Sequence, residues 1–142
     1  DREKWIKEQT VSSFQPGDMQ PVRDHEFKGE KTRTGELNGR KFRKAVNGGW
    51  FSFEMEVRPD ISQDLLVSCW GNLGDIYKFN VEIDGISIAT VIIHWWGNTF
   101  VDKLYHIPFE LTENKKKITV SFKALDNRSV AGPIFNCKII KR

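Results

Sequence analysis

The sequence contains few of the residues from which metal centres and nucleophilic active sites are built. Among its 142 residues are only two cysteines and three histidines, and no Cys-x-x-Cys or Cys/His spacing could close a tetrahedral zinc site. No histidine lies beside a Gly-x-Ser-x-Gly nucleophile elbow. The Gly48-Gly49 pair, which we interpret as a turn, lacks the Lys-Ser/Thr of a phosphate-binding loop. These absences argue against a zinc site, a serine or cysteine nucleophile and a nucleotide site.

Long apolar segments and unbalanced charge are also missing. Apolar runs such as residues 91–93 fall far short of the roughly 20 residues that cross a bilayer. Lys and Arg number 22 against 19 Asp and Glu, and the basic residues alternate with acidic ones instead of forming a stripe. We therefore expect no membrane span and no nucleic-acid partner.

The length and composition fit one domain. With 142 residues, 39% of them hydrophobic, the chain can build a single sizeable core over residues 1–142. The chain starts at Asp1 and no basic and then apolar leader follows, so we expect an excerpt of a longer or processed polypeptide. The sequence shows no fixed-period repeat and no low-complexity tract.

From residue 50 onward the apolar residues recur at a period of two, which indicates β-strands. The predicted strands cover residues 51–57, 65–69, 77–83, 86–93, 105–109, 118–124 and 135–139. Asp84-Gly85 should form a two-residue hairpin turn, and the alternation slips near Ala89-Thr90, which suggests a bulge. Pro108 places the segment 105–109 at a sheet edge or a strand start, and Gly132-Pro133 indicates a turn.

About seven strands without a crossover helix predict an all-β fold, an antiparallel two-sheet β-sandwich of the jelly-roll kind. Residues 1–45 are less regular, so we expect them to form an irregular lead-in across one end of the sandwich, with a strand at residues 10–14. Cys69 and Cys137 share the parity of their apolar neighbours, which predicts two buried free thiols.

Two acidic groups are candidates for a catalytic or a metal site. Glu54 and Glu56 have the spacing of a glycosidase carboxylate pair, but their parity is opposite to that of Phe53, which favours a solvent-facing strand. The Asp24-His25-Glu26 cluster could contribute to a calcium site, but it lacks the six or more oxygen ligands that calcium takes. We therefore predict no catalytic residues, no metal ligands and no cofactor, and interpret the cluster as a salt-bridged surface turn.

The sequence contains stronger signs of ligand binding than of catalysis, at two strand ends that are rich in aromatic residues. Sandwich loops gather at the two ends of the fold, and sugar sites combine a flat aromatic face with hydrogen-bonding side chains. The candidate ligand-binding residues are Trp70, Asp75, His94, Trp95, Trp96 and Asn98. Since some of the five tryptophans must fill the core, we expect at least two to be buried.

A series of short segments extends over nearly the whole chain, and their order is moderately specific for one protein family. They are Pro16-Gly17-Asp18, Asp24-His25-Glu26-Phe27, Gly39-Arg40-Lys41-Phe42-Arg43-Lys44-Ala45, Gly48-Gly49-Trp50-Phe51-Ser52-Phe53, Cys69-Trp70-Gly71, Val81-Glu82-Ile83-Asp84-Gly85, Tyr105-His106-Ile107-Pro108 and Ala131-Gly132-Pro133-Ile134-Phe135. This series resembles the C-terminal accessory domain of bacterial β-L-arabinofuranosidase-type enzymes, glycoside hydrolase family 127, of Bacteroides-like polysaccharide degraders.

The resemblance implies a galactose-binding-like jelly roll that follows a helical-barrel catalytic domain in a periplasmic or extracellular enzyme. The catalytic acids and metal-binding cysteines of that family lie in the barrel, and no position of this chain matches them, so the domain should be noncatalytic. Sugar-binding modules of similar fold often hold a structural calcium, for which this chain offers only Glu26 and Asp126. The implied partners are the catalytic domain of the same polypeptide and plant cell-wall carbohydrate.

Two hypotheses remain open at this point. The domain either binds carbohydrate, directly or by shaping the entrance of an active site, or it packs on its catalytic domain as a purely structural module. The exposure of Trp95 and Trp96 should separate them, since flat, solvent-facing rings favour a ligand and buried rings favour a scaffold.

Overall fold

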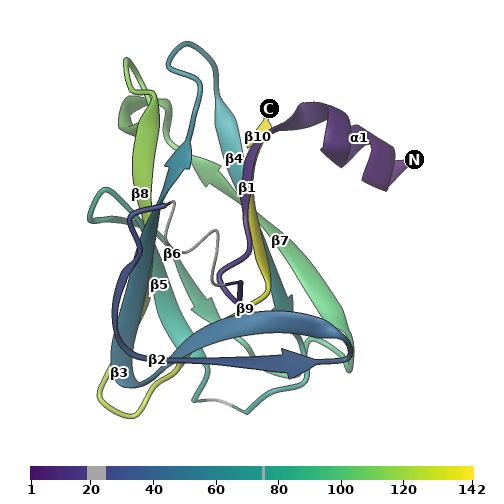
Figure 1. Cartoon of the computed structure of the whole chain (residues 1–142), viewed down its shortest axis with the longest axis vertical. Coiled ribbons are helices and arrows are strands. Elements are labelled where there is room, and N and C mark those ends of the chain that lie inside the picture. Colours follow the sequence, from purple (N-terminus) through teal and green to yellow (C-terminus); the bar gives the residue numbers. More distant parts are fainter. Residues whose placement is uncertain (19–24, 75) are drawn as a thin grey trace.

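In the computed structural model, which describes residues 1–18, 25–74 and 76–142, two antiparallel sheets face each other (Figure 1). The four-stranded sheet has the order β1-β10-β4-β7, and the second sheet has the order β2-β3-β8-β5-β6, with β9 paired to β3. The elements are α1 (Arg2–Gln9), β1 (Thr10–Phe14), β2 (Lys28–Leu37), β3 (Arg40–Glu56), β4 (Gln63–Trp70), β5 (Lys78–Ile83), β6 (Ile86–Ile92), β7 (Phe100–Ile107), a 3-10 turn (Phe109–Leu111), β8 (Lys117–Ala124), β9 (Ala131–Ile134) and β10 (Asn136–Lys141). The predicted all-β sandwich is confirmed.

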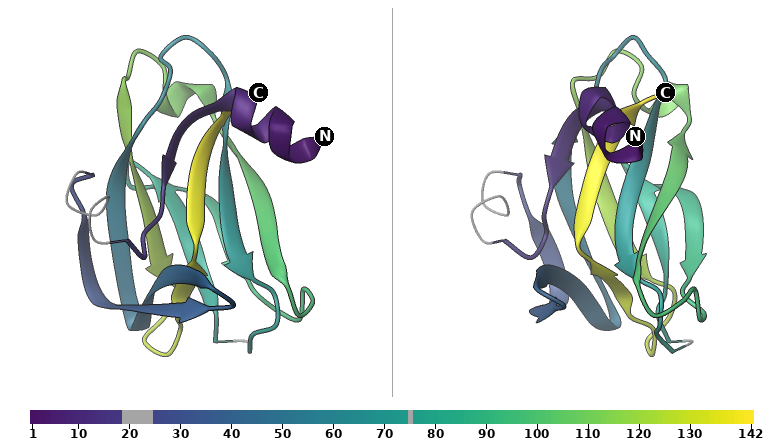
Figure 2. Two further views of the ribbon diagram at one scale, coloured as in Figure 1. Left: turned by 45° about the vertical axis from the view of Figure 1, so that its right-hand side comes forward. Right: turned by 90° about the vertical axis from the view of Figure 1, so that its right-hand side faces the viewer.

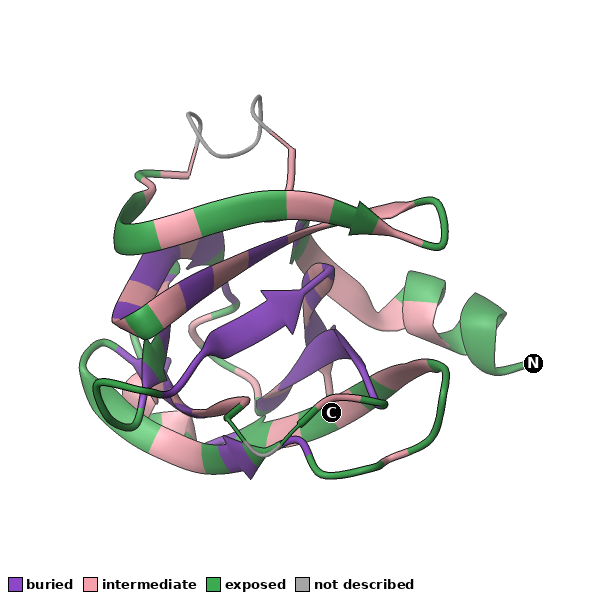
Figure 3. Ribbon diagram, turned by 90° about the horizontal axis from the view of Figure 1, so that it is seen from below, coloured by how far each residue is buried: buried purple, intermediate pink, exposed green. Residues whose placement is uncertain are grey.

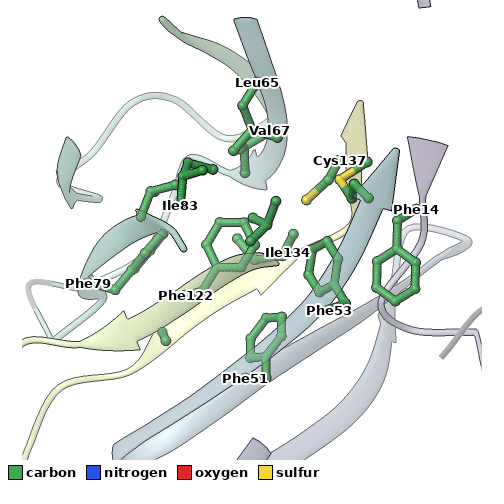
Figure 4. Close-up of a cluster of buried hydrophobic side chains, with 14 of the residues drawn as sticks. Phe14, Phe51, Phe53, Leu65, Val67, Phe79, Ile83, Phe122, Ile134 and Cys137 are labelled. Atoms are coloured by element: carbon green, nitrogen blue, oxygen red, sulfur yellow. The ribbon is translucent and has the colours of Figure 1, made fainter. Parts of the chain in front are cut away.

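The core lies between the sheets and is rich in phenylalanine (Figure 4). Phe51 and Phe53 of β3 are fully buried, because the period of two turns every second residue inward. The ring of Phe53 stacks on that of Phe14 from β1, with a centroid separation of 4.0 Å. This contact joins the two sheets near their edge.

Several local predictions are confirmed. Asp84 and Gly85 form the turn between β5 and β6, with φ angles of 49° and 83°, as a two-residue hairpin with positive φ at both positions requires. The register of β6 shifts between Ser87 and Ala89, one residue before the predicted bulge. β7 lies at the edge of its sheet and ends directly before Pro108.

Both cysteines are buried and free, as predicted. Burial raises the pKa of the Cys69 thiol from its ordinary value of 9.0 to about 12, and it raises the pKa of Cys137 as well. Each thiol therefore behaves as a small apolar side chain of the core.

The prediction of an irregular lead-in over residues 1–45 is wrong. The strand at 10–14 exists and pairs with β10, but β2 and the first part of β3 form a long hairpin that crosses one end of the sandwich (Figure 2). No residue of β2 is buried (Figure 3), so the strand has no buried face and its sequence shows no alternation. The helix α1 was also missed, because none of its eight residues is buried and no apolar stripe marks it.

Two predicted turns lie inside strands. Gly132-Pro133 belongs to β9, which pairs with β3. Gly48-Gly49 lies in β3 at an irregularity, where Glu30 pairs with Trp50 but Thr32 pairs with Ala45. Bulged residues break the local alternation, so the sequence pattern there imitates a turn.

The two chain ends lie near each other at one end of the sandwich, beside α1 (Figure 1). The loops after β4, β6 and β8 lie at the opposite end (Figures 1 and 2). Two of them carry the predicted aromatic site, so that site lies far from both termini. No helix among the described residues has the length and apolarity to span a membrane.

Candidate functional site

Three loops meet at the end of the sandwich opposite the termini, and we call this region the loop end. It comprises residues 71–74 and 76–77 between β4 and β5, residues 93–99 between β6 and β7, and residues 125–130 between β8 and β9. Gly71 N–H donates to Thr99 O at 2.9 Å, and Val130 N–H donates to Ile76 O at 2.8 Å. Hydrogen bonds therefore hold the loop after β4 against both of the others.

The loop after β4 and the loop after β6 approach each other closely at Gly71. A Cβ atom built on Gly71 would lie 2.5 Å from the carbonyl oxygen of Gly97, which is closer than carbon and oxygen can approach. Residue 71 must therefore be glycine, because any side chain there would collide with the backbone of Gly97. The residues that follow the two predicted strand ends, Gly71 and Gly97, are thus neighbours in the fold.

The three predicted tryptophans have different surroundings. Trp95 has 65% of its surface exposed and lies beside His94, with ring centroids 6.4 Å apart. Trp96 is partly buried, and the ammonium of Lys103 lies 4.6 Å from its ring, within the range of a cation–π contact. Trp95 therefore presents an aromatic surface to solvent.

Trp70 does not offer such a surface. It is only 8% exposed and packs edge-on against Phe100, with ring centroids 5.0 Å apart. We predicted that Trp70 contributes to ligand binding. The structure contradicts this prediction, because Phe100 packs against the indole and little of it is exposed. The expectation of at least two buried tryptophans is also wrong, since Trp70 alone is buried.

The predicted polar residues fall into two groups. His94 and Asn98 are exposed, and the Asn98 side-chain oxygen accepts a hydrogen bond of 3.3 Å from the amide of Asn72. Asp75 lies outside the described residues, as does Asp24 of the acidic cluster. Asn72 was missed, although its place in the same loop as Asp75 could have suggested it.

A hollow of about 410 Å³ at the loop end was not predicted. It is lined by Ile76, Lys78, Asp126, Asn127, Arg128 and Ser129. The Asp126 carboxylate accepts hydrogen bonds from Ser129 Oγ at 2.8 Å and Arg128 N–H at 3.0 Å, which lower its pKa. Lys78 Nζ lies 3.6 Å from the same carboxylate. The turn-forming composition of residues 126–129 is the sequence signal that could have drawn attention to this loop.

Exposed apolar side chains also lie at the loop end, and one of them, Ile76, lines this hollow. Ile76 is 47% exposed, and Ile92, which pairs with Lys78 across β5 and β6, is 51% exposed. Leu125 and Trp95 add two more large exposed apolar groups at this end. The loop end therefore combines apolar surface with charged and amide groups, a mixture typical of binding surfaces.

The candidate carboxylates lie elsewhere. Glu54 and Glu56 point outward from β3, since Phe53 and Met55, which alternate with them, are buried. This agrees with the prediction from their parity. The Glu54 carbonyl oxygen lies 2.7 Å from His25 Nδ1. Within the described part of the chain, no group of three or more His, Cys, Asp or Glu side chains could hold a metal ion.

The sequence model of a family of unknown function, DUF6805, matches residues 5–140. The chain belongs to this family. No curated protein matches the chain.

Solved structures similar to this DUF6805 domain include modules of carbohydrate-active proteins. A family 35 carbohydrate-binding module of Clostridium thermocellum matches with a TM-score of 0.64 at 14% identity, over 92% of this chain and 99% of the module. A GH26-CBM35 β-(1,4)-mannanase of Podospora anserina matches with a TM-score of 0.64 at 12% identity, over 92% of this chain and 27% of the enzyme. The domain thus has a jelly-roll fold like that of family 35 modules.

The fold also occurs in other settings. The plant receptor-like kinase ANX1 matches with a TM-score of 0.62 at 13% identity, over 92% of this chain and 41% of that one. At these identities the likeness shows the fold alone, and the function of the DUF6805 domain has to be argued from its own surface.

Proposed function

We propose that this DUF6805 domain is a noncatalytic accessory module that binds carbohydrate through its loop end. The observation that carries the proposal is the position of Trp95, 65% exposed at the end of the sandwich farthest from the termini. A module tethered at one end would present this tryptophan to a ligand at the other. The similarity to carbohydrate-binding modules supports the same interpretation.

The chemistry of the loop end suits a sugar. The C–H face of a pyranose stacks on an aromatic ring, as the indole of Trp95 allows. The exposed side chains of His94 and Asn98 lie one and three residues away and can exchange hydrogen bonds with hydroxyl groups. A small ligand on such an open surface buries little area, so we expect binding in the mM to high-μM range, about −4 to −6 kcal/mol.

The proposal extends to the polypeptide from which the domain comes. The similarity to a module that makes up about a quarter of a mannanase, 27% of its chain, supports an accessory domain beside a catalytic one. The segments resembling family 127 enzymes support a parent that degrades plant polysaccharide in the periplasm or outside the cell. The acid and base of the parent would then lie in its catalytic domain.

A structural role is the second candidate, and one observation favours it. Ile76, Ile92 and Leu125 expose apolar surface around the loop end, which could pack against a neighbouring domain. In that case Trp95 would lie in a domain interface and would not touch sugar.

The two candidates are separated by titration with mannan, xylan, galactan and arabinan oligosaccharides, followed by amide chemical shifts and tryptophan fluorescence. Carbohydrate binding predicts shifts at residues 94–98 that disappear in Trp95→Ala. Trp5→Ala is the matched control, because Trp5 is also exposed, at 47%, but lies on α1 at the other end. If no oligosaccharide perturbs residues 94–98 at tens of mM, binding through the loop end is overturned. If no amide of the domain shifts at all, the structural role replaces carbohydrate binding.

A further inference from the structure

Outward positions of β3 place an aromatic side chain beside polar ones. Trp50, Ser52 and Glu54 of β3 point outward, because Phe51 and Phe53 between them are fully buried. Directly opposite residues of neighbouring strands share a face. Trp50 is therefore flanked by Glu30 of β2 and Lys123 of β8, as the pairing register shows.

The next positions along β3 continue this polar surface. Ser52 lies between Lys28 of β2 and Ser121 of β8, and its side chain is only 6% exposed. Glu54 is partly exposed and lies opposite Thr119. We call this surface the Trp50 strip. Its members are Trp50, Ser52, Glu54, Lys28, Glu30, Thr119, Ser121 and Lys123.

The strip contains a hollow next to its tryptophan. Glu26, Lys28, Ser52, Glu54 and Thr119 line a depression of about 360 Å³. Trp50, which is partly exposed, lies two residues from Ser52, about 7 Å along the strand. An aromatic ring thus adjoins a recess with hydroxyl, ammonium and carboxylate groups.

The composition of the strip excludes two classes of partner. A peptide strand cannot be added, because β3 is paired with β2 on one side and β8 on the other at Trp50 and Ser52. An anionic polymer is disfavoured, because Glu30 and Glu54 interleave with Lys28 and Lys123 and leave no positive field. A neutral glycan needs what the strip has, an aromatic face and several hydrogen-bonding groups.

We propose that the Trp50 strip is a second carbohydrate-binding site, which takes a short neutral oligosaccharide laid along β3. One sugar ring stacks on Trp50, and the next occupies the hollow, where Lys28 and Thr119 form hydrogen bonds with its hydroxyl groups. Trp50 to Glu54 spans about 13 Å of strand, which suits a short oligosaccharide. The inference rests on the proposed function for its ligand class, but its location is independent of the loop end.

The test titrates the full chain and four variants of it with the same mannan, xylan, galactan and arabinan oligosaccharides and follows amide chemical shifts. We expect two separate groups of shifting amides, one at the loop end and one at residues 28, 50–54 and 119–123. Trp50→Ala should weaken binding at the strip by about tenfold or more and leave the loop end unchanged. Trp95→Ala should do the reverse.

Ser121→Arg gives a second test that keeps the tryptophan. Its long side chain would cover the hollow from a partly exposed position, so it should abolish shifts at the strip even if Trp50→Ala lowers the melting temperature. Trp5→Ala should leave both groups of shifts intact.

Each pattern of results has its own meaning. Shifts at the loop end alone would overturn the second site and leave the proposed function standing. Shifts at the strip alone would support the second site and overturn the loop end. No shift anywhere at tens of mM would overturn both.

Discussion

The backbone N–H of Trp96 donates a hydrogen bond of 2.8 Å to the carbonyl oxygen of Gly71. Gly71 in turn donates its own N–H to Thr99, at 2.9 Å. The loop after β4 therefore holds the segment that directly follows Trp95, at Trp96 and at Thr99. Because main-chain groups make these bonds, the position of the exposed tryptophan depends on backbone packing and not on its own side chain.

Gly71→Ala should disrupt this arrangement. The new Cβ would lie 2.5 Å from Gly97 O, so the two loops must separate, and we expect a loss of about 1–3 kcal/mol. Hydrogen exchange at the Trp96 amide should become faster. Gly74→Ala is the control, since a Cβ there meets nothing within 4 Å. Equal stability of the two variants would show that the loops are not locked at Gly71.

Gly85→Val should destabilise the β5–β6 hairpin. Gly85 has a φ of 83°, where a β-branched residue is strained, so we expect a cost of about 1–3 kcal/mol. Thermal unfolding measures this, with Ser87→Val at an exposed strand position as the comparison. An unchanged melting temperature for Gly85→Val would mean that the turn forms elsewhere.

Alkaline pH should destabilise the domain through its buried thiols. The pKa of the Cys69 thiol is about 12 in the folded state and 9.0 ordinarily. Above pH 9 the thiol therefore loses its proton in the unfolded state but keeps it in the folded state. Deprotonation thus favours the unfolded state, and the free energy of unfolding falls as the pH rises. For Cys69 alone the loss should reach about 2 kcal/mol near pH 10.5. Urea titrations between pH 8 and pH 10.5 test this.

The double variant Cys69→Ala, Cys137→Ala provides the control for the alkaline prediction. It should show a shallower decline, since both thiols are buried and both have raised pKa values. Burial also raises the pKa of Tyr105, so some decline at higher pH should remain. A pH dependence identical to that of the parent chain would contradict a role for the thiols.

The isolated domain should hydrolyse no glycoside. Glu54 and Glu56 are adjacent outward positions of one strand, not two carboxyl groups facing each other across a cleft, as glycosidases require. Assays with aryl arabinofuranosides and galactosides should give the background rate for the parent chain, Glu54→Gln and Glu56→Gln. Turnover that disappears in either variant would establish that the domain is an enzyme.

Strand prediction succeeded where one face of a strand is buried. Phe51, Phe53 and Met55 alternate with outward residues, and all three lie in the core. It failed for β2, whose residues are all exposed or partly exposed, and for the bulged part of β3 around Gly48. A strand without a buried face, or with an inserted residue, leaves no period of two to detect.

The fold class, the hairpin at Asp84-Gly85 and the burial of both cysteines could be predicted from the sequence, because each follows from local alternation or turn chemistry. The covering of Trp70 by Phe100 and the exposure of Trp95 could not be predicted in this way. Nor could the meeting of the loops after β4, β6 and β8 at one end, or the pairing of Trp50 with Lys123 of the neighbouring strand. These relationships depend on strand order and register, which are set by contacts between residues far apart in the chain and leave no signal in any single segment.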